Sequence, residues 1–315
     1  MEVTSSTPDS PDASTSTSSE SPAIPWGWLR ATVYLVVVAL AVIFVEIVFQ
    51  VAVSMAGYRE TAIDSPIGVL EQFLQLCVVV LVTLLFRKLV DRRSFVSLGF
   101  NIRTVYARDF LSGLGFGLVL ILMIYGLLAA MDQISVVYTG ISLITCLRLV
   151  VLMIIVALTE EIAVRGYILN NLLQSFGRFG LVAVLISSLL FGGLHLLNPN
   201  VSWPGLANIV LAGMILGLYY NYRRNLWFPI GLHFSWNFVQ GPVLGSPVSG
   251  KWIDSMFNYI SEGQELLTGG SFGLEASLLT TCAFLVALLS IHLIYRQGPI
   301  RPISSTATFS DISQN

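Results

Sequence analysis

The sequence predicts an all-α polytopic membrane protein, an eight-transmembrane-helix bundle with both termini in the cytoplasm. Three observations predict this class. Hydrophobic residues make up 55% of the chain and charged residues only 11%, with a mean hydropathy of +0.79, a composition far from that of a water-soluble domain. Apolar runs long enough to cross a bilayer recur along the chain. The basic residues gather in alternate connections between these runs.

The apolar runs give the order of the expected helices, because each bilayer crossing takes roughly 20 mostly apolar residues. We expect eight crossings, centred near Ile43, Val79, Leu120, Met153, Leu189, Met214, Phe234 and Leu285. No hydrophilic stretch after residue 30 is long enough to make a second domain. We therefore predict one membrane domain over residues 26–298, with its core motifs between residues 140 and 245.

The two ends of the chain differ in composition from the domain between them. Residues 1–25 are rich in Ser, Thr and Pro, carry acidic residues and contain no lysine or arginine. Such a segment cannot bury enough apolar surface to offset the entropy of an ordered chain. We predict a disordered tail there and a second one over residues 299–315. A secretory signal would need a basic start, so we expect the first apolar run to remain as a helix.

The distribution of basic residues predicts the orientation of the bundle. The larger group consists of Arg30, the cluster from Arg87 to Arg108, Arg178, the Arg223 and Arg224 pair, Arg296 and Arg301. The opposite side has Arg59 and Lys251 alone. Because the side richer in arginine and lysine faces the cytoplasm, both termini are predicted to be cytoplasmic.

One connection in the second half is longer than the rest, from Gly241 to Gly270. Its GKWIDSMFNYI portion fits a short helix on the outer membrane face, and a plain loop fits equally well.

The ALTEEIAVRGY stretch places three charges directly behind an uncharged apolar run. An ionisable residue at membrane depth costs about 2.5–3.5 kcal/mol on insertion scales, so it needs a partner or a function. Glu161 and Arg165 are four positions apart with the acid first, the order that favours an ion pair on one helix face. Glu160 lies about 100° around the helix from Glu161. It must therefore find its partner on another helix.

His195 is the candidate partner of Glu160. The LLFGGLHLLNP run places Phe191 and His195 one helical turn apart. A turn around Gly177 and Arg178 would leave Glu160 and His195 each about 17 residues away, at equal depth in an antiparallel hairpin.

A third run, GLHFSWNF, brings His233 and Asn237 to a similar depth. Their spacing of four places both side chains on one helix face. The sequence thus predicts that a glutamate, two histidines and an asparagine meet at one level of the bundle.

This set of residues permits two chemistries. In a low-dielectric site Glu160 is a better general base toward water than a surface glutamate, with His195 holding that water. His233 and Asn237 could then donate hydrogen bonds to the oxyanion formed during amide hydrolysis. Alternatively, Glu160, His195 and His233 could hold a divalent metal such as zinc, with one position open for water. No HExxH motif is present to decide between them.

The motifs also resemble those of the CPBP family of intramembrane proteases, which includes the type II CAAX prenyl endopeptidases and bacterial proteins labelled abortive-infection (Abi) or bacteriocin-processing. The resemblance lies in Glu-Glu-x-x-x-Arg at Glu160, Glu161 and Arg165, Phe-x-x-x-His at Phe191 and His195, and His-x-x-x-Asn at His233 and Asn237. The RRSFVSLGF and YRRNLWFPIGLHFSWN stretches look like bacterial members, so similarity covers residues 90 to 245. Val164 stands where many members carry an aromatic residue.

The resemblance implies an eight-helix intramembrane endopeptidase of a prokaryotic plasma membrane, acting on a membrane-associated peptide that is CAAX-like or of another kind. It implies that Glu160 and His195 bind the attacking water and that His233 and Asn237 form the oxyanion site. Glu161 and Arg165 would support these residues, and the resemblance leaves open whether a metal is required. We expect the peptide and the lipid bilayer as partners, and no nucleic acid. The competing hypothesis is a non-catalytic immunity or scaffold protein of the same fold. A proton-coupled carrier is disfavoured because the two halves show no internal repeat.

Overall fold

The computed structural model describes residues 21–58, 62–100 and 104–296. The predicted tails fall outside these ranges except for residues 21–25, where the Ala23 N–H donates to the Val90 carbonyl at 2.8 Å. Arg59, Arg103 and Arg301, which contributed to the predicted orientation, also lie outside the described residues. The predicted domain boundaries therefore stay predictions.

Helices dominate the described residues. The α-helices are α1 (Gly27–Met55), α2 (Pro66–Leu85), α3 (Thr104–Ala130), α4 (Leu143–Glu160), α5 (Asn170–Phe176), α6 (Gly180–Leu194), α7 (Trp203–Arg223), α8 (Trp227–Phe238), α9 (Glu265–Thr268) and α10 (Leu278–Tyr295). Three π-helical segments continue them: η1 (Phe86–Val90), η3 (Glu161–Leu169) and η5 (Val239–Val243). Short 3₁₀ turns are η2 (Phe95–Leu98), η4 (Gly177–Phe179), η6 (Gly270–Phe272) and η7 (Leu274–Ala276).

Six stretches of the described chain are helical, long and apolar enough to cross a membrane. The chain is therefore an integral multi-pass membrane protein. One of the six, 143–194, is broken by the turn η4 and folds back on itself as a hairpin, as the sequence predicted around Gly177. Every predicted apolar run coincides with a helix. The count of eight crossings stays a prediction, since α8 has only 12 residues of its own.

Serine side chains cap the starts of several of these helices. Ser65, Ser142 and Ser202 each accept a hydrogen bond from the backbone N–H three residues later. Proline stands in the first turn of α2 and α7, where its missing N–H costs nothing. Because these caps satisfy N–H groups that have no partner within the helix, they fix where each helix begins.

Glycines allow α3 and α8 to pack closely. A Cβ atom at Gly113 would collide with the Phe228 carbonyl, and one at Gly231 would collide with the Phe110 carbonyl. Small residues at a helix contact let two backbones approach, which is the usual basis of helix association inside a membrane. This contact holds α8, and with it His233, at a fixed distance from α3.

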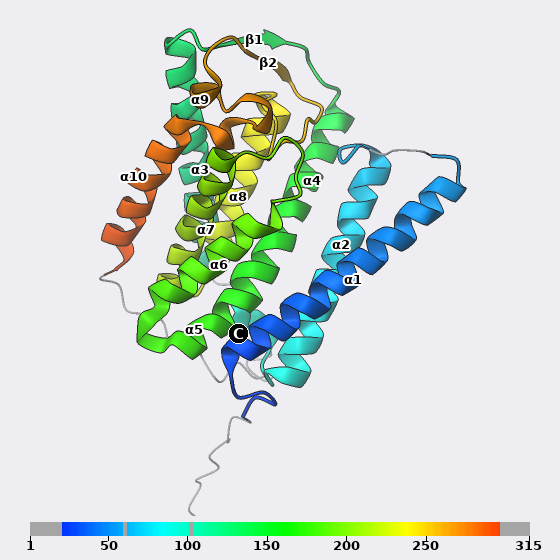
Figure 1. Cartoon of the computed structure of the whole chain (residues 1–315), viewed down its shortest axis with the longest axis vertical. Helices are drawn as coiled ribbons and strands as arrows, with labels where there is room; N and C mark the ends of the chain where they lie inside the picture. The colour runs from blue at the N-terminus through cyan, green and yellow to red at the C-terminus, as the bar shows by residue number, and fades with distance from the viewer. Residues whose placement is uncertain (1–20, 59–61, 101–103, 297–315) are drawn as a thin grey trace, which may run out of the picture.

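A small sheet and loops cap one end of the bundle. Strands β1 (Ile134–Tyr138) and β2 (Phe257–Ser261) pair antiparallel, with Val136 opposite Tyr259. The segment expected as a short helix or a plain loop thus contains a strand, because its partner strand, far away in sequence, satisfies its backbone groups. Figure 1 shows this cap above α3, α8 and α10, while α1 and α2 lie to one side of the bundle.

The start of α1 lies at the end of the bundle opposite the cap, and α10 runs from the cap toward that end (Figure 1). The end of α2 and the turn between α5 and α6 lie there too. The predicted cytoplasmic location of this end stays a prediction.

Candidate active site

The residues assigned to chemistry lie on three elements that face one cavity. Glu160 is the last residue of α4, His195 follows the last residue of α6, and His233 and Asn237 lie on α8. All four line a cavity of about 590 Å³, together with mostly apolar side chains from α1, α2, α7 and α10. The structure therefore brings these four residues together, as the spacing of the motifs predicted.

Glu161 and Arg165 form the expected ion pair. Nη1 of Arg165 lies 2.8 Å from Oε1 of Glu161, and the two side chains are 1% and 0% exposed respectively. The guanidinium carbon of Arg165 lies 4.0 Å from the centroid of the Phe191 ring, a distance typical of a cation–π contact. The phenylalanine of the second motif therefore covers the arginine of the first.

The same oxygen of Glu161 also contacts His233. Nδ1 of His233 lies 3.0 Å from Oε1 of Glu161. A carboxylate held in an ion pair can only accept, so Nδ1 carries the hydrogen and donates it. The other ring nitrogen, Nε2, then lies 3.8 Å from Oε2 of Glu160. This orienting contact joins residues 72 positions apart, so local spacing in the sequence does not predict it.

Glu160 differs from its neighbour in exposure. Its side chain is 30% exposed, whereas that of Glu161 is 0% exposed. Its Oε2 atom has no hydrogen-bond partner among the described residues. The 3.8 Å gap to His233 is too long for a direct hydrogen bond, whereas a water molecule between the two groups could bond to both. Glu160 thus presents an unpartnered carboxylate oxygen to the cavity, beside His233.

Phe191 orients His195 through its backbone. Nδ1 of His195 lies 2.8 Å from the Phe191 carbonyl oxygen, which can only accept, so Nδ1 donates and Nε2 keeps its lone pair. The Phe191 ring also lies edge-on to both imidazoles, with centroids 4.9 Å from His195 and 6.3 Å from His233. The Phe-x-x-x-His spacing therefore brings the Phe191 carbonyl within hydrogen-bond reach of His195, and the ring contacts both imidazoles.

Asn237 lies one turn beyond His233 on α8, as its spacing predicted. Its side chain is 7% exposed and lines the cavity. Its amide makes no hydrogen bond within the described part of the chain, so its N–H groups are available to a bound molecule.

The zinc alternative requires three ligands around one point. Over the residues that the structure describes, no group of three His, Cys, Asp or Glu side chains is placed to hold a metal ion. The Nδ1 atoms of His195 and His233 are engaged with Phe191 and Glu161, so only their Nε2 atoms could reach an ion. The arrangement of Glu160, His195 and His233 does not fit a metal centre, and we derive no step through one.

Glu275, on η7, is a further carboxylate at the same cavity. Ser249 donates to Oε1 from its N–H at 3.0 Å and its hydroxyl at 3.2 Å, and the Gln240 amide donates to Oε2. Burial raises its pKa to about 7, although the hydrogen bonds from Gln240 and Ser249 lower it. The sequence signal that could have found it is an acid in the glycine-rich GGSFGLEAS segment, just before the last apolar run.

Comparison with known families supports the reading of this region. Residues 142–239 match the family model of the type II CAAX prenyl endopeptidase Rce1-like proteins. The match covers less than half of the chain and includes all seven motif residues from Glu160 to Asn237. No curated protein and no solved structure matches the chain.

Proposed function

We propose that this chain, which is Rce1-like over residues 142–239, is an intramembrane endopeptidase that hydrolyses a membrane-associated peptide with a water molecule activated by Glu160. One observation carries the proposal. Glu160, His195, His233 and Asn237, from three separate elements, converge on one cavity. Each of them offers a polar atom that the surrounding protein does not use.

Glu160 supplies the base in this proposal. Its unpartnered Oε2 takes a proton from water as the water oxygen attacks the peptide carbonyl carbon. Nε2 of His195 has a free lone pair and accepts the second hydrogen of that water. The two groups together orient the water for attack.

Asn237 and His233 stabilise the negative charge that develops on the carbonyl oxygen. The Asn237 amide donates directly, and Nε2–H of His233 donates when the ring carries both hydrogens. The proton held by Glu160 then passes to the amide nitrogen, the C–N bond breaks, and a carboxylic acid and an amine leave.

Glu161 and Arg165 position the ring of His233 in this proposal. Glu161 fixes its tautomer and direction, and Arg165 neutralises the buried charge of Glu161. Neither residue lines the cavity, so their effect on the reaction passes through His233.

The cavity walls favour a substrate with apolar side chains near the cleaved bond. Apolar residues from several helices make up most of the cavity wall, including Val38 of α1, Val79 of α2 and Met153 of α4. A membrane-associated peptide end, of CAAX type or another, has this character.

The test compares cleavage of a peptide library by the wild-type protein and Glu160→Gln in detergent and in lipid vesicles. We expect Glu160→Gln to lose activity by about 100-fold or more, the lower range for removing a general base. Glu46→Gln is the matched control, because Glu46 is a carboxylate of the same cavity on α1 and belongs to none of the motifs. Thermal unfolding checks that both variants fold.

Two outcomes would overturn the proposal in different ways. Equal cleavage by the wild type and Glu160→Gln would mean that another group activates the water. No cleavage of any peptide by a folded wild-type protein would favour the competing function, a non-catalytic immunity or scaffold protein of the same fold.

A further inference from the structure

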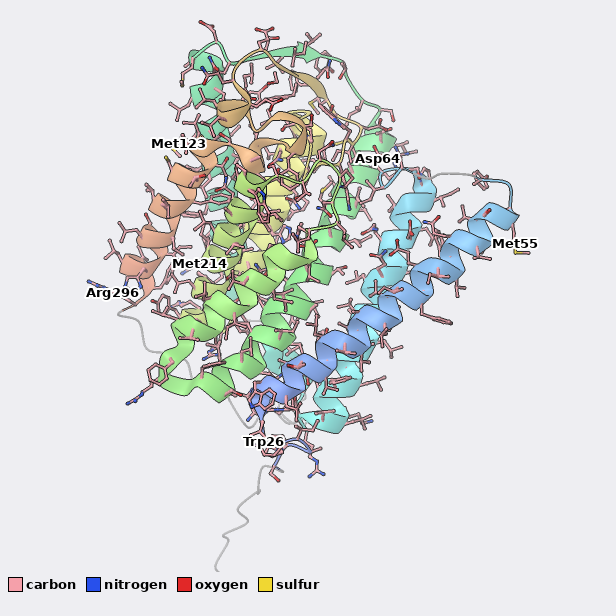
Figure 2. All side chains as sticks on the ribbon, viewed as in Figure 1. Trp26, Met55, Asp64, Met123, Met214 and Arg296 are labelled. Atoms are coloured by element: carbon pink, nitrogen blue, oxygen red, sulfur yellow. The ribbon has the colours of Figure 1, made fainter. Side chains whose placement is uncertain are left out.

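A second pocket lies where α1 begins, at the opposite end of the bundle from the cap. It has a volume of about 420 Å³, and its walls include Trp26, Trp28, Arg30, Gln174 and Ser175. Figure 2 shows Trp26 at the lower end of the bundle, far from Asp64 at the end of the helices where the cap lies. The catalytic proposal makes no use of this pocket.

Arg30 and Gln174 bring unpartnered donors to the pocket. Arg30 is only 2% exposed. Its Nη1 donates to Asp91 and its Nη2 to Gln174, each at 2.9 Å. Its Nε and the Nε2 of Gln174 are both buried and lack a partner among the described residues. Two buried donors on one pocket wall require an acceptor, because an unmet buried donor costs about 1–3 kcal/mol.

The N-terminus of α1 adds further donors. This helix has 29 residues, and the side chain of its own N-cap residue, Trp26, does not cap the first turn. The Ser175 hydroxyl oxygen accepts a hydrogen bond from the Trp28 N–H at 2.7 Å. The remaining N–H groups of the first turn and the helix dipole favour an anion at this position.

The ion pairs behind the pocket leave an excess of positive charge. Arg30 and Arg87 share the single carboxylate of Asp91, and all three side chains are nearly fully buried. Arg93 lies beside them with its Nη1 buried and unpartnered in the described part of the chain. Burial, more than the neighbouring Arg87 and Arg30, lowers the pKa of Arg93, and Asp91 opposes this shift. Three guanidiniums against one carboxylate give this cluster a formal charge of +2.

The geometry points to a phosphate-binding site in this pocket, occupied by the headgroup of an anionic phospholipid. A phosphate group has several acceptor oxygens, so it can take hydrogen bonds from Arg30, Gln174 and the α1 N-terminus at once. Its negative charge offsets the excess of the arginine cluster. Trp26 and Trp28 are 59% and 51% exposed, and such rings are typical of the membrane–water interface, where phospholipid phosphates lie.

The test measures thermal unfolding of the full-length protein in neutral detergent as ligand is titrated. The probes are short-chain phosphatidylglycerol, short-chain phosphatidylcholine and inorganic phosphate, with sodium chloride at matched ionic strength as the reference. A ligand that binds the folded state raises the Tm, and a tighter ligand does so at a lower concentration. We expect phosphatidylglycerol to raise the Tm at a concentration at least about tenfold lower than phosphatidylcholine requires. The choline group of phosphatidylcholine carries a positive charge that compensates its phosphate.

Gln174→Glu separates binding from folding. A glutamate oxygen can still accept from Nη2 of Arg30, while the unpartnered donor is replaced by a negative charge. We expect the variant to unfold at or above the wild-type Tm without ligand and to bind phosphatidylglycerol at least about tenfold more weakly, since the added charge faces the phosphate. Lys88→Gln is the control, because it removes an exposed cation outside the pocket walls and should leave binding unchanged.

A stabilising effect of inorganic phosphate alone would support the site and assign it to free phosphate, whereas an effect of phosphatidylglycerol alone would support the lipid. The inference is wrong if neither ligand stabilises the wild type more than sodium chloride does. It is also wrong if Gln174→Glu binds as tightly as the wild type. These outcomes are independent of peptide cleavage.

Discussion

Replacing Glu275 by glutamine should remove a specific pH dependence of stability. Glu275 is 6% exposed, and burial raises its pKa from 4.5 to about 7. Below pH 4.5 the carboxyl is protonated in both the folded and the unfolded chain. Between pH 4.5 and about 7 the unfolded chain releases this proton while the folded protein retains it, so unfolding becomes easier as the pH rises. Above pH 7 both states are ionised and the effect is complete.

The size of the effect follows from the shift in pKa. Each pKa unit corresponds to about 1.4 kcal/mol, so the free energy of unfolding should fall by roughly 3 kcal/mol across this window. For a chain of this size we expect a decrease in Tm of roughly 6 °C. In Glu275→Gln the neutral amide has no such titration. Its oxygen can still accept from Ser249, and Gln240 can turn its unpartnered Oε1 toward the new N–H group.

The assay is thermal unfolding of both proteins in detergent at half-unit steps from pH 4 to pH 8. The difference in Tm between Glu275→Gln and the wild type should rise with pH through this window and level off near pH 7. Other titrating groups cancel in this difference, because they are common to both proteins. A difference that is constant with pH would refute the reasoning, since it would mean that Glu275 has the same proton affinity in the folded and unfolded states.

Three further predictions test the packing and the site. Gly113→Ala should lower the Tm by several degrees, because its Cβ would meet the Phe228 carbonyl. Gly115→Ala has open space around its Cβ and should be neutral or slightly stabilising. Equal effects of the two substitutions on the Tm would contradict the close contact of α3 and α8. Glu161→Gln should lose peptide cleavage, and its free energy of unfolding should fall by about 3–5 kcal/mol because Arg165 is left buried without its counter-charge. Retention of the wild-type Tm would argue against a stabilising Glu161–Arg165 pair. Dialysis against a strong zinc chelator should leave kcat/KM unchanged, and recovery of lost activity on adding zinc would show that a metal takes part.

Local spacing accounts for the parts of the fold and site that could be predicted from the sequence. Glu161 and Arg165 lie four positions apart on one helix, so their ion pair follows from helix geometry alone. The same holds for the shared face of His233 and Asn237. The hairpin at Gly177 could be predicted because a polar turn interrupts two apolar runs.

Contacts between distant segments could not be predicted in this way. The hydrogen bond from His233 to Glu161 depends on the relative rotation of α8 and η3, which packing of the whole bundle decides. The strand pair that caps the bundle depends on two segments more than a hundred residues apart, such as Val136 and Tyr259. Glu275 joins the cavity only because the cap folds back over α7, where the Asn208 amide donates to its backbone carbonyl at 2.7 Å.

Glu160 and Glu161 show how one dipeptide can supply two chemically different carboxylates. Their side chains leave the helix in different directions, so one faces the cavity and the other the protein interior. Oε1 of Glu161 already accepts from Arg165 and His233, and a carboxylate engaged with two donors is a poor base. Oε2 is unpartnered in both glutamates within the described residues, but only Glu160 lines the cavity, with its Oε2 beside the same histidine. If the roles were exchangeable, Glu160→Gln and Glu161→Gln would impair cleavage and stability alike. Under the proposed mechanism we instead expect Glu160→Gln to lose cleavage by about 100-fold or more at an unchanged Tm.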